Sequence, residues 1–379
     1  MGTARAALTA VAGLAALTVI AIPALSMRLG LPDGSSEAQD STQYQAYKLV
    51  EDKFGAGLNG PLLVTAQLPG AVDGNDLLAA QARVGNVLLD QRDVAAVAPI
   101  GQSADKTLLA YQVVPEGGPN SESTAQLVRD LRGLSPLTGG VQLGVAGSAS
   151  GNIDISKQLA DALPRYLAVV LGLSLLILIF VFRSILVPLT ATLGFVLSLF
   201  ATFGGITAIF QWGWLGAVFG VHDPGPVLSF LPTILIGILF GLAMDYQLFL
   251  VSGMREAYAH GAPARLAVRQ GVHAGRIVVV AAAIIMISVF GGFIFSQTTM
   301  IRSLGFGLAF GVLADAFLIR MLLIPAVMHL LGRSAWWIPR WLDRILPNVD
   351  VEGAALERSH PVPHASADPA DRSPVTTAP

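Results

Sequence analysis

The order of hydrophobic and polar positions divides the chain into six apolar segments and one long polar region. The first apolar segment, 6–25, holds 20 residues without a charge, and the polar region 29–164 follows it. About 20 apolar residues, rising 1.5 Å each, cross the ~30 Å hydrocarbon core of a bilayer. The pattern therefore predicts a bundle of six transmembrane helices. The remaining apolar segments are Tyr166–Phe182, Ile185–Phe210, Val227–Val251, Ile277–Phe295 and Leu304–Leu331.

The first segment has an alternative interpretation as a cleaved signal peptide. Ala24, Leu25 and Ser26 form an acceptable cleavage site after it. Its apolar run is longer than the usual core of about 7–15 residues in a secretory signal. The length favours a retained transmembrane helix.

The polar region has the periodicity of a folded α+β domain. Asn75 is a candidate cap for its first helix, and Ser123 with Gln126 forms a capping box for its second. Strands and helices follow in the order βαββαβ, which predicts a ferredoxin-like unit. A further helix over 42–54 precedes it. The predicted strands are 62–67, 94–100, 107–114 and 141–146, and the predicted helices are 75–90 and 123–134.

A glycine-rich segment, GSASG at 147–151, ends the polar region. It resembles the G-x-S-x-G elbow of serine hydrolases, but its central residue is Ala149 instead of the nucleophilic serine. We interpret the segment as a flexible return to the membrane.

Composition supports a membrane protein and excludes several kinds of site. Hydrophobic residues make up 53% of the chain and charged residues 13%, against about 25% charged in soluble proteins. There is no cysteine, and the six histidines lack metal-ligand spacing. None of the four lysines follows a glycine, so no Gly-Lys-Ser/Thr phosphate loop exists. We therefore expect no metal, no cofactor, no ATP site and no nucleic-acid partner.

The distribution of arginines predicts the orientation of the helices. The short loops 211–226 and 296–303 hold only Arg302, whereas the opposite side collects nine arginines. Because cytoplasmic loops are enriched in positive charge, both termini are expected in the cytoplasm. The 29–164 region, with 8 Lys and Arg against 15 Asp and Glu, is then extracytoplasmic. The nine arginines are Arg5, Arg183, Arg255, Arg265, Arg269, Arg276, Arg333, Arg340 and Arg344.

Two C-terminal segments follow the last apolar run. The segment 333–347 interleaves Trp336, Trp337 and Trp341 with arginines, a pattern typical of an anchor at the membrane interface. The segment 351–379 is rich in Pro, Ser, Ala and Asp without apolar periodicity, so we predict a disordered cytoplasmic tail.

Asp245 is the first candidate functional residue, because it lies near the centre of an apolar segment. An aspartate at that depth costs roughly 2.5–3.5 kcal/mol on insertion scales. Gly237, Gly241 and Asp245 recur every four residues, and glycines at that spacing let a neighbouring helix approach closely. One interpretation is a packing groove with a hydrogen-bonded aspartate. The functional interpretation is a carboxylate that handles ions or protons.

The last apolar segment repeats this arrangement with Gly307, Gly311 and Asp315, and Arg320 follows. Both aspartates lie about 15 residues into helices that run in the same direction, so they are expected at similar depth. In an α-helix, residues five apart point about 140° from one another. We therefore expect direct pairing of Asp315 with Arg320 to be poor.

These positions together predict a buried polar cluster of Asp245, Tyr246 and Asp315, with Arg320 as counter-charge. Desolvation favours the neutral form of a carboxyl group and brings its proton exchange closer to physiological pH. The alternative is that Asp315 and Arg320 pair only in order to be tolerated in lipid.

The sequence resembles the second half of an MMPL-type transporter of the RND superfamily over about 28–347. The residues that carry the resemblance are GSASGNIDISKQLADALPRY, FRSILVP, QWGW, FLPTILIGILFGLAMDYQLFLVSGMREAY, GFGLAFGVLADAFLIRMLLIPA and GRSAWWIPRWLDRILP. The AMDY and WWIPRWLD stretches are the most specific.

The resemblance implies a proton-driven exporter of lipids or other hydrophobic molecules in the bacterial inner membrane, and not an enzyme. It also implies a porter domain outside the cytoplasm. The proton-relay role of the family's central Asp-Tyr pair then falls on Asp245 and Tyr246. Family members resemble two such halves in tandem, and only one is present here. A homodimer or a separate first half is the expected partner, because parallel repeats pair about an axis along the membrane normal.

Two other functions remain open from the sequence. Two aspartates on neighbouring helices could activate water in an intramembrane aspartyl protease. The YD and G-x-G-D patterns of such proteases are not matched, because Ala243 and Met244 precede Asp245 and Tyr246 follows it. The other alternative is a partner subunit or lipid-sensing scaffold that does not transport.

Overall fold

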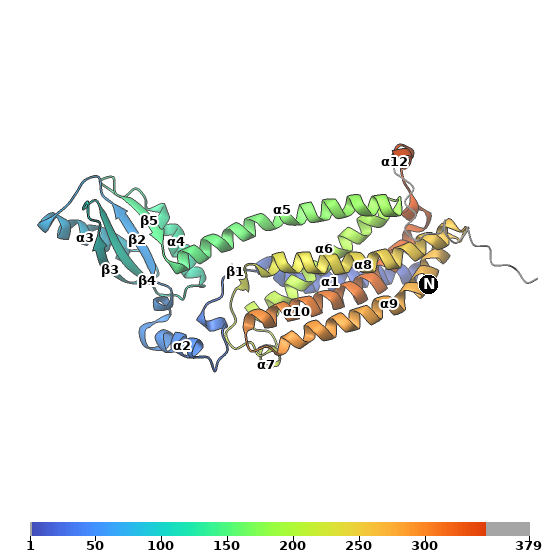
Figure 1. Cartoon of the computed structure of the whole chain (residues 1–379), viewed down its shortest axis with the longest axis horizontal. Helices are drawn as coiled ribbons and strands as arrows, with labels where there is room; N and C mark the ends of the chain where they lie inside the picture. The colour runs from blue at the N-terminus through green and yellow to red at the C-terminus, as the bar shows by residue number, and fades with distance from the viewer. Residues whose placement is uncertain (1, 346–379) are drawn as a thin grey trace, which may run out of the picture.

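The computed structural model describes residues 2–345 and is mostly helical, with two small sheets. An elongated helix bundle forms one end of the molecule, and a four-stranded sheet lies at the other end (Figure 1). The tail predicted for 351–379 and the last residues of the segment 333–347 lie outside the described residues.

Six helical segments between residues 2 and 345 are long and apolar enough to cross a membrane, which agrees with the six predicted segments. Several contain a short 3₁₀-helical or π-helical segment within or at the end of the α-helix. The spans are α1 (Thr3–Ala21) with η1 (Ile22–Ser26), α5 (Ser148–Phe182), α6 (Leu186–Ile206) with η4 (Thr207–Gln211), α8 (Leu231–Ala259), α9 (Ala264–Gly292) with η5 (Phe293–Phe295), and α10 (Thr299–Leu313) with η6 (Ala314–Leu323), α11 (Ile324–Leu331) and η7 (Gly332–Trp336).

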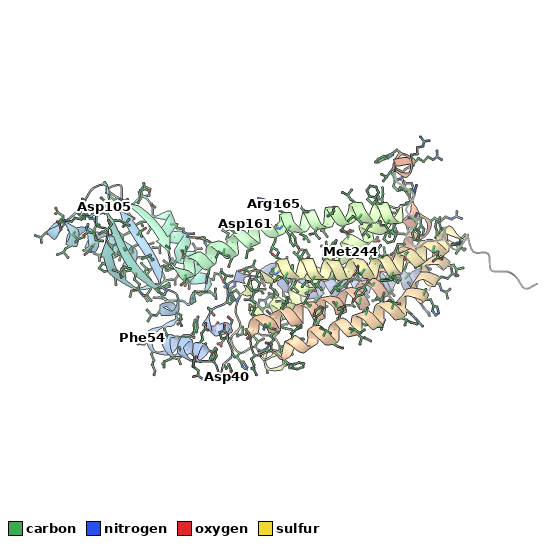
Figure 2. All side chains as sticks on the ribbon, viewed as in Figure 1. Asp40, Phe54, Asp105, Asp161, Arg165 and Met244 are labelled. Carbon is green, nitrogen blue, oxygen red and sulfur yellow. The ribbon has the colours of Figure 1, made fainter. Side chains whose placement is uncertain are left out.

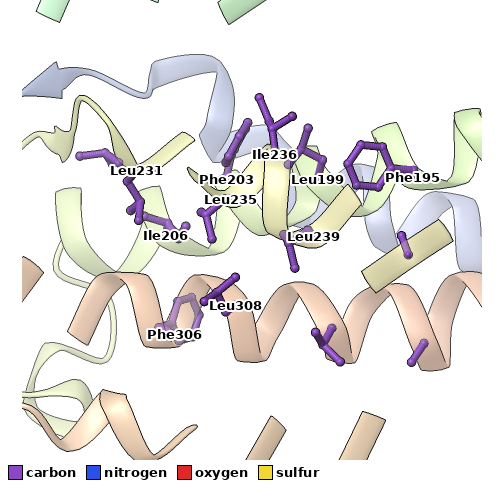
Figure 3. Packing of buried hydrophobic residues seen from close by; sticks show 14 of the residues in the cluster. Phe195, Leu199, Phe203, Ile206, Leu231, Leu235, Ile236, Leu239, Phe306 and Leu308 are labelled. Carbon is purple, nitrogen blue, oxygen red and sulfur yellow. The ribbon is translucent and has the colours of Figure 1, made fainter. Parts of the chain in front are cut away.

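The bundle is built around α6, α8 and α10. Leu199 and Ile206 of α6, Leu235 of α8 and Phe306 of α10 belong to one buried apolar cluster (Figure 3). In contrast, α5 and α9 bury few of their apolar side chains, and some are largely exposed, including Leu173 at 59% and Ile277 at 70%. Exposed apolar surface on this scale marks a membrane or protein contact in a chain of this kind. The outer helices thus present the surface expected to face lipid.

The sheet has the order β3-β4-β2-β5, with all neighbours antiparallel. Its buried face carries alternate residues, such as Leu62, Val64 and Ala66 on the central strand β2, and packs against two helices. The bounds are β2 (Leu62–Gln67), α3 (Gly74–Leu89), β3 (Val94–Gln102), β4 (Leu108–Pro115), α4 (Glu122–Gly133) and β5 (Gln142–Ala146). Near them lie η2 (Gly34–Ser36), α2 (Thr42–Phe54) and η3 (Ala56–Asn59).

Two predicted helix caps are wrong by two residues. Asp73 caps α3 in place of Asn75, and its side chain accepts from the Gly74 amide. Ser121 caps α4 in place of Ser123, and its hydroxyl accepts from the Thr124 amide. In both cases an earlier residue of cap-forming type begins the helix, which sequence pattern alone does not distinguish.

The segment 147–151 was predicted to be a flexible return to the membrane, and this is wrong. Ser148 begins α5, which runs for 35 residues as one α-helix to Phe182 with Pro164 inside it. The helix predicted to begin at Tyr166 therefore begins 18 residues earlier. Figure 2 shows Asp161 and Arg165 on the part of α5 that leads into the bundle.

A short parallel sheet stands where α1 leaves the bundle and α8 enters it. β1 (Leu29–Gly30) pairs with β6 (Val227–Leu228). The Val227 amide donates to Arg28 and the Ser229 amide to Gly30. The short α7 (Gly216–Phe219) precedes β6, and α12 (Arg340–Ile345) ends the described chain. This pairing fixes the start of α8, the helix that carries Asp245.

Candidate functional site

Asp315 and Arg320 form a buried ion pair inside η6, a π-helical segment. The Arg320 Nε lies 3.2 Å from one Asp315 carboxylate oxygen and 3.4 Å from the other. Arg320 is fully buried and Asp315 is 5% exposed. A π-helix closes hydrogen bonds between residues five apart, so such residues come toward one face. The expectation of poor pairing assumed α-helical geometry and is wrong.

Gln247 completes the cluster from α8, and the sequence analysis missed it. Its Oε1 accepts a hydrogen bond from Nη1 of Arg320, and the side chain is fully buried. Gln247 follows Ala243 by four residues and precedes Leu250 by three, and both of those are buried on α8. A glutamine at helical spacing among apolar residues was the available signal.

Tyr246 lies beside this cluster, whereas Asp245 does not lie in it. Tyr246 is 6% exposed, and its hydroxyl is buried next to Gln247 in the chain. Asp245 itself is exposed on the surface of the single chain. Consecutive residues of an α-helix point about 100° apart, which separates the two side chains. The structure therefore brings Tyr246, Asp315 and Arg320 together and leaves Asp245 on an open face of α8.

That open face is lined by the first pair of glycines. Gly237, Gly241 and Asp245 are all exposed, and nothing lies within 4 Å of a Cβ built on Gly241. A Cβ on Gly237 meets only the Tyr166 hydroxyl, at 3.1 Å. Figure 2 labels Met244, the residue before Asp245, midway along the bundle. Within the described chain, this groove holds no neighbouring helix at Gly241.

The second pair of glycines has the opposite environment. A Cβ on Gly307 would lie 3.0 Å from Leu235, and one on Gly311 would lie 2.6 Å from Leu239. Both leucines belong to α8, so these glycines admit α8 against α10. The glycines thereby position η6, which continues α10, beside Tyr246 and Gln247.

Three buried polar atoms of the cluster have no hydrogen-bond partner within residues 2–345. They are Tyr246 Oη, Gln247 Nε2 and Arg320 Nη2. A buried polar atom without a partner costs about 1–3 kcal/mol, so native proteins keep few of them. Such atoms on three adjacent side chains mark a place where water or another polar group is expected.

A second polar cluster lies at the sheet end of the bundle, and the sequence analysis did not identify it. Asp223, in the loop before α8, accepts from Lys48 Nζ at 2.9 Å and from the Tyr44 hydroxyl at 2.8 Å. The hydrogen bond to Asp223 raises the pKa of Lys48 above its ordinary value. Burial raises the pKa of Tyr47, which donates to Asp33. This cluster ties α2 to the loop that leads into α8.

No group of three or more His, Asp and Glu residues in the part of the chain that the structure describes could hold a metal ion.

Comparison with known proteins assigns the sequence to a family. The sequence matches the model of the MMPL family over residues 35–349. The chain belongs to the MMPL family. It is 45% identical over 342 residues to membrane protein YdfJ of Bacillus subtilis, which covers 90% of this chain and 47% of that protein.

Two relatives in this family are named for lipid export. The chain is 30% identical over 353 residues to the mycolic acid-containing lipids exporter MmpL11 of Mycolicibacterium smegmatis, covering 91% of this chain and 36% of that protein. It is 34% identical over 283 residues to the trehalose monomycolate exporter MmpL3 of Mycobacterium tuberculosis, covering 73% of this chain and 29% of that protein. These names are those of transporters and not of enzymes, in agreement with the sequence analysis.

The chain is thus a multi-pass membrane protein of the MMPL family, of the RND type. It spans about half the length, or less, of the curated relatives it matches.

Proposed function

We propose that this chain is one half of a proton-driven MMPL exporter that moves lipids or other hydrophobic molecules across the bacterial inner membrane. The observation that carries the proposal is the charged cluster of Asp315, Arg320 and Gln247 beside the partnerless hydroxyl of Tyr246 in a membrane-spanning segment. Ionisable groups at that depth are costly and are retained at proton and ion pathways. The lipid exporters among the relatives support the substrate class.

In this proposal, Asp245 binds and releases the proton. Asp245 is exposed on α8. The buried phenol of Tyr246, which has no hydrogen-bond partner within the described chain, is proposed to link Asp245 to the buried cluster through water. Arg320 stabilises the ionised form of Asp315. A proton that binds to Asp245 then reduces the net negative charge of this part of the bundle.

The open face of α8 supports a partner. Gly237 and Gly241 leave room there for a close helix, and Asp245 lies at the same face. A second copy of this chain, or a separately encoded first half, would place its own polar groups against Asp245. Parallel repeats about an axis along the membrane normal bring equivalent helices together in this way.

The sheet unit is proposed to be a ferredoxin-like porter domain outside the cytoplasm. Its order β2-α3-β3-β4-α4-β5 and its antiparallel sheet β3-β4-β2-β5 are those of a βαββαβ unit. The excess of arginine at the other end of the bundle supports the orientation with both termini in the cytoplasm.

The experiment that tests the function is the Asp245→Asn variant in vesicles with an imposed pH gradient. Asparagine keeps the size of the side chain and is cheaper to place in a membrane, so insertion and abundance should be normal. It does not titrate near neutral pH, so gradient-dependent lipid export should be lost. Asp161→Asn is the matched control, because Asp161 lies on α5 and forms its ion pair with the exposed Lys157.

Full gradient-dependent export by Asp245→Asn, at normal abundance and with its partner present, would contradict the proton relay. That result would favour a scaffold or partner subunit that does not transport.

A further inference from the structure

A row of basic side chains runs along the first turns of α9, at the end of the bundle away from the sheet (Figure 1). Arg265, Arg269, His273 and Arg276 are spaced four, four and three residues apart, so they share one face of the helix. All four are exposed. No acidic residue lies on α9. The row is therefore a positive surface without compensating charge on its own helix.

A cavity of about 270 Å³ lies beside this row, between α9 and the segment η6–α11. Arg269, His273 and Arg276 contribute its polar lining from α9, and His329 contributes from α11. Val272 is part of its apolar lining. None of the described residues that line it is acidic. The cavity thus combines a basic mouth with an apolar wall.

His329 distinguishes this cavity from a simple row of surface arginines. It is 6% exposed and lines the cavity, yet it takes part in no hydrogen bond within residues 2–345. Arg265 and Arg269 lie close enough to act on it electrostatically. A mostly buried imidazole without a protein partner can donate its N–H to an acceptor group bound in the cavity.

We infer that this cavity binds the headgroup of an anionic phospholipid. The phosphate oxygens would accept from the arginines and His329, and the acyl chains would lie along the exposed apolar surface of α9, including Ile277 and Val278. A free phosphate would use the basic groups but not the apolar wall. The assignment to the inner leaflet rests on the proposed orientation, whereas binding does not depend on transport.

Native mass spectrometry of the full chain in detergent tests the inference with phosphatidylglycerol and phosphatidylcholine as probes. Phosphatidylglycerol should bind more tightly, and Arg269→Gln or Arg276→Gln should weaken it about fivefold each. The matched control is Arg340→Gln, because Arg340 is exposed at the same end of the molecule but does not line the cavity. It should leave binding unchanged.

Val272→Phe tests the contribution of the cavity volume independently of the charges. The larger side chain fills part of the cavity and keeps every arginine, so phosphatidylglycerol binding should fall while the elution volume and melting temperature stay normal. An equal loss in Arg340→Gln, or unchanged binding in both Val272→Phe and the arginine variants, would overturn the inference. Complete displacement by inorganic phosphate would overturn it also, because the site would then bind phosphate without a lipid.

Discussion

Arg320 donates to Asp315 from five residues further along the same segment, because the helix between them is π-helical. Both side chains are buried, so neither charge is exposed to solvent within the described chain. Removing one partner of a buried pair leaves an uncompensated charge, whereas replacing both with apolar groups is often neutral. The pair therefore allows stability and function to be measured separately.

The first prediction concerns this pair. Asp315→Asn should destabilise the folded chain by about 3–5 kcal/mol, because Arg320 loses its counter-charge. The double variant Asp315→Leu with Arg320→Met should regain most of the abundance and melting temperature of the original protein. It should remain less stable by about 1–3 kcal/mol, because the buried Gln247 oxygen then lacks its donor. It should still lack gradient-dependent export in the complete transporter. Restored export in the double variant would assign the pair a structural role alone.

The second prediction concerns Tyr246, whose hydroxyl is buried without a partner in the described chain. Tyr246→Phe removes a polar atom that costs about 1–3 kcal/mol to bury unsatisfied. In the isolated chain the melting temperature should therefore stay the same or rise. Export by the assembled transporter should fall, but less than in Asp245→Asn, because the titrating group remains. A clear loss of stability in the isolated chain would mean that the hydroxyl has a partner within it.

Hydrophobic periodicity was sufficient to predict the six membrane segments and the strand-helix order of the sheet unit. It also placed Gly237, Gly241 and Asp245 on one face of α8, since an α-helix repeats nearly every four residues. These features depend on local sequence and on a regular helix. They follow from residue types alone.

The irregular part of the site was not predictable in this way. The π-helical turn between Asp315 and Arg320 does not change the apolar pattern, so the sequence analysis placed the two charges on different faces. The five-residue spacing of opposite charges in an apolar segment was the only local signal. Gln247 was missed because its importance depends on Arg320, which is 73 residues away along the chain. Long-range pairing of this kind follows from tertiary structure.

The third prediction compares two glycines that have the same spacing but different surroundings. Gly311→Val should destabilise the chain, because its Cβ would lie 2.6 Å from the end of the Leu239 side chain, which would have to shift within the packed core. The expected loss is about 1–3 kcal/mol, as in other overpacked cores. Gly241→Val should leave the isolated chain unchanged, because nothing lies within 4 Å of its Cβ.

In the assembled transporter, Gly241→Val should weaken the association of the two halves. Unfolding of the isolated chain and crosslinking of the halves measure the two effects. Equal effects of both variants on the isolated chain would contradict the open face of α8.

The fourth prediction concerns pH and the contact between Lys48 and Asp223. The raised pKa of Lys48 means that the charged amine is stabilised in the folded chain. Its contribution is therefore complete below the ordinary lysine pKa of about 10.4 and is lost as pH rises through the higher folded value.

The difference in melting temperature between the original protein and Lys48→Met should be constant from neutral pH to about pH 10. It should then shrink at higher pH. Lys53→Met is the control, because Lys53 lies on the same helix with an exposed side chain, whereas Asp223 accepts from Lys48 and Tyr44. A difference that disappears already near neutral pH would show that Lys48 does not maintain the contact.

The last prediction concerns orientation, and the absence of cysteine makes it directly measurable. Ala104 and Val218 are both exposed, one in the turn of the sheet unit beside Asp105 (Figure 2) and one in α7. Ser334 is exposed in η7 at the opposite end of the bundle. Cysteines at positions 104 and 218 should react with an impermeant maleimide in spheroplasts whose inner membrane is intact. A cysteine at position 334 should react only after permeabilisation, because the arginine-rich end is expected in the cytoplasm. The reverse pattern would place the sheet unit in the cytoplasm and contradict its proposed role as a porter domain.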